Sequence, residues 1–175
     1  MRNVVFLIIL CCLFAACDQP KPESASAPAK PPRLEIGDST KSQICKEGIM
    51  ALAAGDVDGF ASSMADNVVY MWNSGDSIAG KAAIVDYWKD RHANVIEKMS
   101  VSNVALLSLK VNESKVVPPG DYVLMWASVT ASYKGGKSMT QLVHNAYSFD
   151  SSGKINRITQ YIDRAPIMAA MPAKK

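Results

Sequence analysis

The chain has 175 residues, of which 49% are hydrophobic, and its 19 basic and 16 acidic side chains give a formal net charge of +3. Because lysine and arginine do not cluster along the sequence, the composition argues against a nucleic-acid-binding surface. Once an N-terminal signal and a linker are set aside, the remaining length is typical of a single domain.

The first 16 residues have the layout of a secretion signal. Arg2 gives a positive start, residues 4–14 form an apolar run, and two alanines follow; the run is shorter than the roughly 20 residues that span a bilayer. Residues 13–17 (LFAAC) resemble the lipobox of bacterial lipoproteins. That resemblance implies acylation of Cys17 and a lipid anchor in the membrane. The alternatives are ordinary cleavage with a secreted product, a membrane-anchor helix, or a helix buried in the core.

The segment after Cys17 is typical of a tether. Residues 18–32 contain five prolines and no aliphatic side chain larger than alanine, so they cannot bury enough apolar surface to fold, and proline keeps them extended. We therefore expect a signal at 1–16, a lipidated cysteine and tether at 17–39, and a domain at 40–170. The domain would lie outside the cytoplasm, in the cell envelope.

The cysteines and histidines do not predict a metal site. Three of the four cysteines belong to the signal or would carry lipid, which leaves Cys45 without a partner for a disulfide. The only histidines, His92 and His144, have no cluster of ligand residues around them. We expect neither a metal ion nor another cofactor.

Three helices are predicted at the start of the domain. The first covers residues 40–54, and the second begins after Asp56 with apolar side chains, including Phe60, at i, i+3, i+4 and i+7. A strand at 68–72 and a third helix at 81–97 follow.

The rest of the domain has the pattern of antiparallel strands separated by turns. These strands are expected at residues 101–111, 121–133, 137–149 and 154–163. Helices followed by a strand meander predict an α+β fold in which the helices cover one face of a curved sheet.

Several short motifs resemble the nuclear transport factor 2-like superfamily, in its SnoaL-like and ketosteroid-isomerase-like bacterial branches. They are AGDVDGF at 54–60, ADNVVY at 65–70, GKAAI at 80–84, DSSGKI at 150–155 and YID at 161–163. The resemblance implies a cone-shaped curved antiparallel sheet wrapped around three N-terminal helices, with an apolar cavity inside. The superfamily includes isomerases, cyclases, dehydratases and epoxide hydrolases, and also non-catalytic, often dimeric, binding domains, so the fold does not decide the function.

Strand register predicts which side chains share a face. If residues 135–136 form a two-residue turn and 150–153 a four-residue loop, Ala127 opposes His144, and His144 opposes Thr159. Apolar residues such as Met125 then share a face with His144 and Asp163, which is the composition of a ligand pocket. A change of one residue in a loop would move a strand's side chains to the other face.

Asp163 and His144 are the candidate catalytic residues. In the resembling enzymes an aspartate that ends the last strand acts as acid or base, and apolar surroundings would raise the pKa of such a carboxyl. The alternatives are an ion pair of Asp163 with an arginine and a structural role for His144. The residues expected to contact a ligand are Tyr70, Trp88, Arg157 and Tyr161.

Three functions are consistent with this sequence. The first is a membrane-tethered domain that binds a small, largely apolar molecule, and the second is an enzyme that uses Asp163 and His144 for proton transfer or water addition. The third is an interaction module that forms a homodimer, or holds another envelope protein, through its open sheet face. The resembling isomerases need two oxyanion donors besides a base, and the sequence shows no such set, which favours the first.

Overall fold

The computed structural model describes residues 31–172. The predicted signal, Cys17 and most of the tether lie outside the described residues. The elements in chain order are β1 (Leu34–Ile36), α1 (Ser39–Ala54), α2 (Val57–Ala61), β2 (Met64–Trp72), β3 (Ser77–Ala79), α3 (Lys81–Asn94), β4 (Ile96–Val111), β5 (Gly120–Tyr133), β6 (Ser138–Phe149), β7 (Ile155–Tyr161) and α4 (Arg164–Ala170). Within this part of the chain, no helix is long and apolar enough to cross a membrane.

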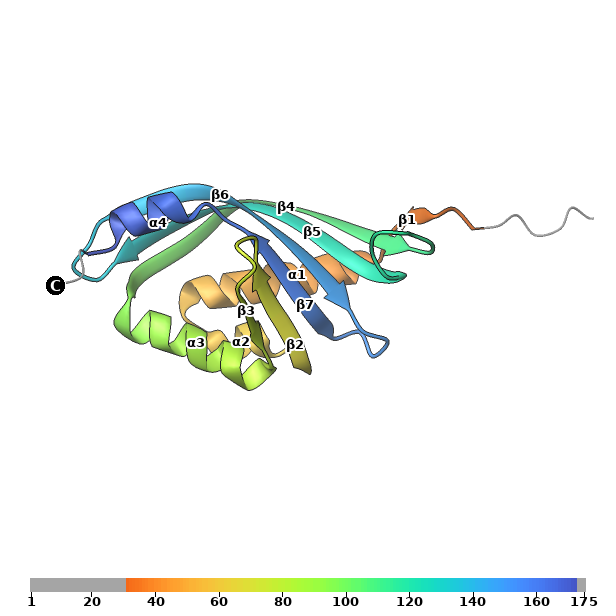
Figure 1. Cartoon of the computed structure of the whole chain (residues 1–175), viewed down its shortest axis with the longest axis horizontal. Helices are drawn as coiled ribbons and strands as arrows, with labels where there is room; N and C mark the ends of the chain where they lie inside the picture. Colours follow the sequence, from red (N-terminus) through yellow and green to blue (C-terminus); the bar gives the residue numbers. More distant parts are fainter. Residues whose placement is uncertain (1–30, 173–175) are drawn as a thin grey trace, which may run out of the picture. The chain divides into compact units, whose positions relative to one another are not determined.

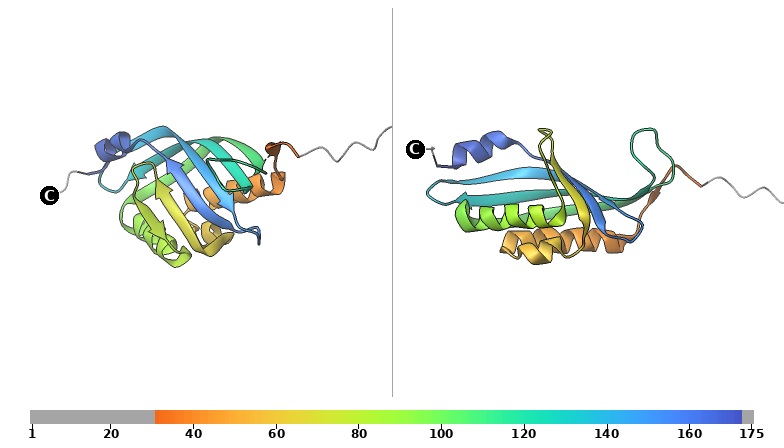
Figure 2. Two further views of the ribbon diagram at one scale, coloured as in Figure 1. Left: turned by 45° about the vertical axis from the view of Figure 1, so that its right-hand side comes forward. Right: turned by 60° about the horizontal axis from the view of Figure 1, so that its bottom comes forward.

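The seven strands form one curved sheet in the order β1-β4-β5-β6-β7-β2-β3. Every neighbouring pair is antiparallel except β2 and β7, which run parallel. Helices α1, α2 and α3 lie in the hollow of the bent sheet, whereas α4 extends along one end of β6 (Figures 1 and 2). The predicted α+β fold, with a curved sheet wrapped around three helices, is confirmed.

Local signals define the first two helices closely. Gly55 ends α1 in the left-handed conformation at φ 83°, which glycine adopts without steric cost. Asp56 then caps α2, and its carboxylate accepts a hydrogen bond of 2.8 Å from the backbone N–H of Gly59. β1 lies within residues assigned to the tether, and its pairing with β4 brings the start of the folded part before residue 40.

Two predicted boundaries are wrong because strand pairing begins earlier than the sequence pattern indicates. Met64, assigned to the second helix, is the first residue of β2 and pairs with Ile155 of β7. Ile96, assigned to the third helix, is the first residue of β4 and pairs with Tyr133. Both Met64 and Ile96 are buried, so an apolar side chain at these positions fits the pattern of a helix as well as that of a strand.

The core fills the space between the helices and the concave face of the sheet. An aromatic cluster at its centre surrounds Trp88, whose ring centroid lies 6.4 Å from that of Phe60, 6.2 Å from Tyr70 and 5.3 Å from Tyr87. Phe60 is only 5% exposed, as the apolar pattern of the second helix predicts. Helices α2 and α3 are therefore joined to the sheet through aromatic contacts.

The observed register differs from the predicted one. Trp126 of β5, rather than Ala127, pairs with His144 of β6, and Tyr161 rather than Thr159 pairs with His144 on the other side. The β5–β6 turn has three residues, because the backbone N–H of Tyr133 donates to the carbonyl of Lys137 at 3.2 Å.

In this register, the side chains of β5 that were predicted to share a face with His144 lie on the opposite face of the sheet. Met125 and Ala127 face the helices, whereas Trp126 and His144 face outward. The residues predicted to form one face of a pocket therefore lie on two opposite faces of the sheet.

Candidate active-site cavity

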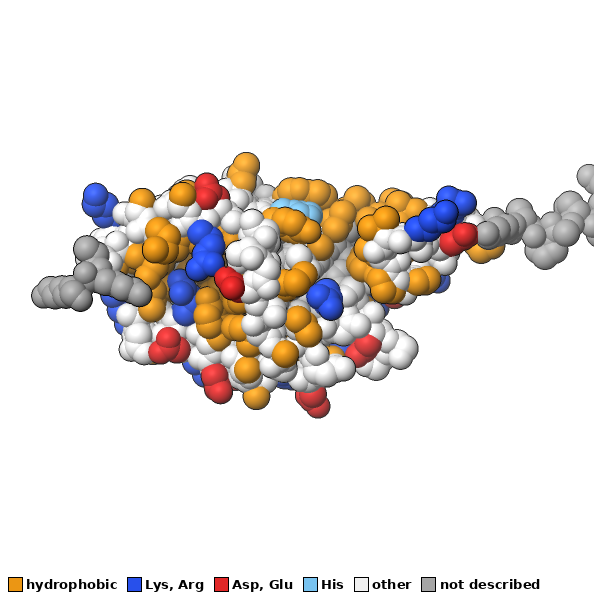
Figure 3. All heavy atoms as spheres, viewed as in Figure 1, with side chains coloured by type: hydrophobic (Ala, Val, Ile, Leu, Met, Phe, Trp, Pro, Cys, Tyr) orange, Lys and Arg blue, Asp and Glu red, His pale blue; other side chains and the backbone are white. Residues whose placement is uncertain are grey.

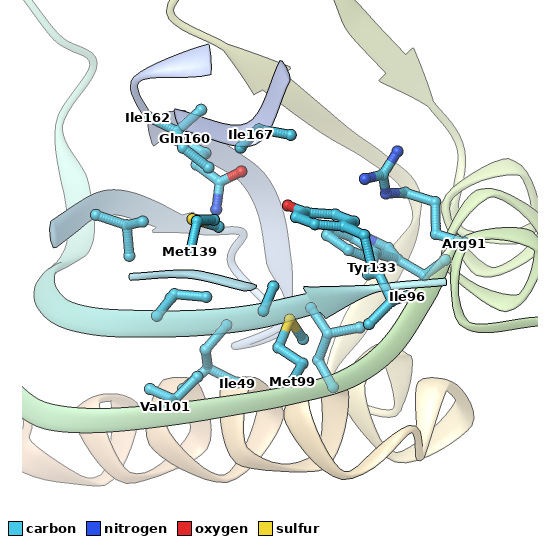
Figure 4. Close-up of a pocket in the computed structure, with 15 residues that line it drawn as sticks. Ile49, Arg91, Ile96, Met99, Val101, Tyr133, Met139, Gln160, Ile162 and Ile167 are labelled. Carbon is cyan, nitrogen blue, oxygen red and sulfur yellow. The ribbon is translucent and has the colours of Figure 1, made fainter. Parts of the chain in front are cut away.

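A small cavity of about 70 Å³ lies between the helices and the concave face of the sheet, close to α4 (Figure 4). Its wall comes from α1, α3, strands β4 to β7 and the C-terminal segment, and is mostly aliphatic. The lining residues are Ile49, Leu52, Trp88, Arg91, Ile96, Met99, Val101, Val129, Ala131, Tyr133, Met139, Val143, Gln160, Ile162 and Ile167. Such a wall, with few polar groups, is typical of a ligand pocket.

Four of the lining residues have polar groups. The indole N–H of Trp88 is buried and has no hydrogen-bond partner among the described residues. The Gln160 amide oxygen accepts a hydrogen bond of 3.1 Å from the indole of Trp72, which fixes the orientation of this amide. Arg91 reaches the cavity from α3, and the Tyr133 hydroxyl points into it from β5 (Figure 4). The polar groups thus come from two sides of the cavity.

Burial keeps the nearby phenols protonated. It raises the pKa of Tyr133, and it raises the pKa of Tyr70 well above its usual range, while the positive charge of Arg91 acts in the opposite direction on both. Tyr70 is 2% exposed and packs against the Trp88 ring. At neutral pH both phenols are hydrogen-bond donors and neither is a base.

The wall of the cavity has no carboxylate, imidazole or thiol. None of the lining residues is an aspartate, glutamate, histidine or cysteine. Over residues 31–172, no three histidine, cysteine or acidic side chains come together in a way that could hold a metal ion. Cys45 is buried elsewhere in the core, where desolvation raises the pKa of its thiol to about 12.

His144 does not lie in the cavity, so its predicted placement is wrong. It lies on the outer face of the sheet, between the rings of Trp126 at 4.9 Å and Tyr161 at 5.5 Å. Its Nδ1 is 3.0 Å from the carbonyl oxygen of Met125, where it donates as the protonated ring nitrogen. Tyr161 is 50% exposed and is likewise absent from the cavity wall.

Asp163 is exposed and caps a helix instead of facing the cavity. Its carboxylate accepts a hydrogen bond of 2.8 Å from the backbone N–H of Ala165, at the start of α4. The alternative, an ion pair of Asp163 with an arginine, is not formed with the neighbouring Arg164, because the Arg164 guanidinium binds the carboxylate of Asp76 at 2.9 Å. Arg157 is exposed on the outer face of β7. The structure therefore brings none of these charged residues to one site.

Trp88 is the predicted ligand contact that lies in the cavity wall, and Tyr70 lies directly behind it. Sequence reasoning missed Arg91 and Tyr133. One signal could have indicated Arg91: it follows Trp88 by three residues, so both side chains share one face of the third helix. For Tyr133 the signal was lost with the register of β5.

Comparison with known proteins places this chain in a family. A model of the SnoaL-like domain matches residues 47–158, well over half of the chain. The chain belongs to the SnoaL-like domain family. None of the curated proteins with which the sequence was compared matches it.

Solved structures show that this SnoaL-like domain has the nuclear transport factor 2-like fold. One is a nuclear transport factor 2-like protein of unknown function from Burkholderia pseudomallei K96243 (TM-score 0.60, 15% identity, covering 78% of this chain and 100% of that one). A second is a protein with a ketosteroid isomerase-like fold from Catenulispora acidiphila DSM 44928, in complex with trimethylamine. It gives a TM-score of 0.57 at 16% identity and covers 73% of this chain and 91% of that one. An epoxide hydrolase from Mycobacterium tuberculosis gives a TM-score of 0.56 at 15% identity, covering 74% of this chain and 87% of that one.

Proposed function

We propose that the protein is a membrane-anchored lipoprotein whose SnoaL-like domain binds a small, largely apolar molecule in the cavity. The observation that carries this proposal is an apolar cavity of about 70 Å³ whose wall has no carboxylate, imidazole or thiol. Proton-transfer chemistry needs a base within hydrogen-bond reach of the substrate. A wall of aliphatic side chains with a few fixed polar groups instead supports binding and orientation.

The structural relatives show the fold of this domain but not its ligand. The Catenulispora protein holds the small molecule trimethylamine, and the Mycobacterium protein is described as an epoxide hydrolase. At 16% and 15% identity these likenesses extend only to the fold. The Asp163 and His144 positions support no catalytic pair, since one caps α4 and the other stacks on the outer face.

The membrane anchor in this proposal rests on the sequence. A lipobox-like segment ends at Cys17, and a proline-rich stretch separates it from β1. An extended proline-rich chain covers about 3.1 Å per residue, so the linker is long enough to hold the domain clear of the lipid surface. The protein would thus present its cavity in the cell envelope, outside the cytoplasm.

Native mass spectrometry of the mature protein, purified from its own host in mild detergent, tests the binding function directly. We expect a co-purifying small molecule that dissociates when the protein unfolds. Repeated recovery of the ligand-free mass alone would contradict the proposal for the growth conditions used.

Filling the cavity should abolish binding without disturbing the fold. Ala131 is 3% exposed and lines the cavity, and leucine at this position adds about the volume that is empty. Xenon enters dry apolar cavities, so in the wild type it should shift the NMR signals of the lining methyl groups of Met99 and Met139. In Ala131→Leu the shifts should fall at least tenfold.

The matched control for this experiment is Ala105→Leu, the same change at an exposed position of β4. It should keep the full xenon response. If xenon leaves both methionine signals unmoved in the wild-type protein, the cavity is not accessible and the proposed function is wrong.

The outer face of the sheet favours a second candidate, a homodimer. Three large side chains on neighbouring strands are exposed there, Leu142 by 79%, Tyr161 by 50% and Trp126 by 45%, and hydrophobic side chains gather over the sheet at the top of Figure 3. A two-fold interface uses the same patch on both subunits, and exposed apolar patches mark interaction sites.

Disulfide trapping in native membranes tests this homodimer. Leu142→Cys should give a disulfide-linked dimer on a non-reducing gel, because a two-fold axis through the patch brings the two copies of this residue together. Ala82→Cys, on the exposed side of α3, is the control and should stay monomeric. Equal trapping of the two variants would reflect random collision and would count against the interface.

A further inference from the structure

We infer that the cavity accepts a small monocarboxylate, whose anionic end binds Arg91 and the Trp88 indole and whose apolar tail fills the enclosed space. This inference rests on the proposed binding function and narrows it to one chemical class. It follows from the hydrogen-bond donors in the cavity wall, the absence of acidic residues there, and the volume available.

Arg91 carries a positive charge that no described residue neutralises. The ion pairs of residues 31–172 join Lys41 to Asp121, Lys89 to Asp58 and Arg164 to Asp76, and no hydrogen bond of the Arg91 guanidinium is formed within this part of the chain. The guanidinium lies 5.7 Å from the centre of the Tyr87 ring, and the residue as a whole is partly buried. A guanidinium without an ion-pair or hydrogen-bond partner is favourably placed for a carboxylate, which it can bind through two parallel hydrogen bonds.

Trp88 provides a second donor on the same face of α3. Its side chain is 9% exposed, and its indole N–H is buried without a partner among residues 31–172. Because Trp88 and Arg91 are three residues apart on one helix, their side chains lie next to each other. A buried donor without a partner costs free energy, and a ligand oxygen at this point would remove that cost.

The other polar groups at the cavity also favour an anion over a cation. Tyr133 lines the cavity, and burial raises the pKa of its phenol, so its hydroxyl offers a donor there. The oxygen of Gln160 is already occupied by the indole of Trp72, which leaves its amide nitrogen for further contacts. No acidic side chain lines the cavity that could hold a cation.

The volume limits the size of the ligand's tail. An engineered apolar cavity of roughly 150 Å³ takes benzene, which corresponds to about 25 Å³ per carbon atom. By the same ratio, the cavity of about 70 Å³ takes a tail of about three carbon atoms. A carboxylate on a branched three-carbon group, such as isobutyrate, therefore matches both the space and the donors.

The experiment compares isobutyrate with its neutral isostere isobutyramide, using the mature full-length protein in detergent micelles. Binding is followed through the NMR signal of the Trp88 indole N–H, assigned with Trp88→Phe. We expect isobutyrate to move this signal downfield and to bind at least tenfold more tightly than the amide. Equal affinity for the two compounds would overturn the anion inference while leaving the proposed binding function intact.

Arg91→Gln removes the charge and shortens the side chain, while keeping a polar end. It should weaken isobutyrate binding at least tenfold and leave isobutyramide binding within about twofold. Arg157→Gln is the matched control, because it makes the same change at an exposed arginine on the outer face, and it should bind isobutyrate as the wild type does.

Three further results would overturn this inference. Undiminished isobutyrate binding by Arg91→Gln would do so, and so would equal losses in Arg91→Gln and Arg157→Gln. If neither compound binds the wild-type protein although xenon enters the cavity, only the carboxylate assignment is wrong. If xenon does not enter the cavity either, the proposed function is wrong as well. Because the acid-to-amide comparison uses the wild-type protein, it remains decisive even if Arg91→Gln does not fold.

Discussion

A serine in place of Cys17 should remove all fatty-acyl label from the protein. If the LFAAC segment directs lipidation, the Cys17 sulfur is the atom that receives the diacylglycerol, and a hydroxyl at that position cannot replace it. Cells grown with an alkyne analogue of palmitate would show labelled wild-type protein and no signal from Cys17→Ser. The variant should also lose the mature form on a gel and appear as precursor or as a shed soluble protein.

Cys12→Ser is the control for this experiment, because it changes a nearby cysteine within the same predicted signal. It should be labelled and processed as the wild type is. If Cys17→Ser kept its label and its membrane fractionation, the lipoprotein assignment would be wrong, although the fold and the cavity would be unaffected.

Phe60→Ala should lower the free energy of unfolding by about 3–5 kcal/mol, the usual cost of truncating a buried phenylalanine. Phe60 is 5% exposed and meets the Trp88 ring edge-on at 6.4 Å, so its loss leaves a hole where α2 joins α3. The free energy of unfolding of a typical domain is about 5–15 kcal/mol. Because Phe60→Ala removes a large part of it, the variant should be close to unfolding at 37 °C. Urea unfolding of the mature protein, followed by tryptophan fluorescence, measures the change.

Met168→Ala is a suitable comparison for Phe60→Ala, because it also truncates a large apolar side chain but at a position on α4 that is 65% exposed. Surface changes of this kind usually alter stability by no more than about 0.5 kcal/mol. Similar losses in the two variants would show that α2 does not pack as described.

The sequence was sufficient to predict the elements whose signals are local. Gly55 and Asp56 mark the junction of α1 and α2 through their own backbone conformation and hydrogen bonds. The boundaries at Met64 and Ile96 could not be predicted in this way, because each residue is apolar in both alternatives and its pairing partner is far away in the sequence. Tertiary pairing, and not propensity, decided these positions.

The predicted site failed for a similar reason. Its geometry depended on the length of one hairpin loop, and the three-residue turn after Tyr133 places Met125 and His144 on opposite faces. The cavity is instead formed around α3, where Trp88 was recognised and Arg91 was not. A helix face becomes a cavity wall only when the sheet curves over it, and no local pattern in the sequence specifies that curvature.

The parallel pairing of β2 with β7 has a consequence for how the protein is made. Residue 70 lies beside residue 158 in this sheet, so the two strands meet only after almost the whole domain has left the ribosome. Contacts between such distant residues slow folding. A chain with an export signal at its start would therefore still lack a complete sheet while its N-terminus is engaged by the export machinery.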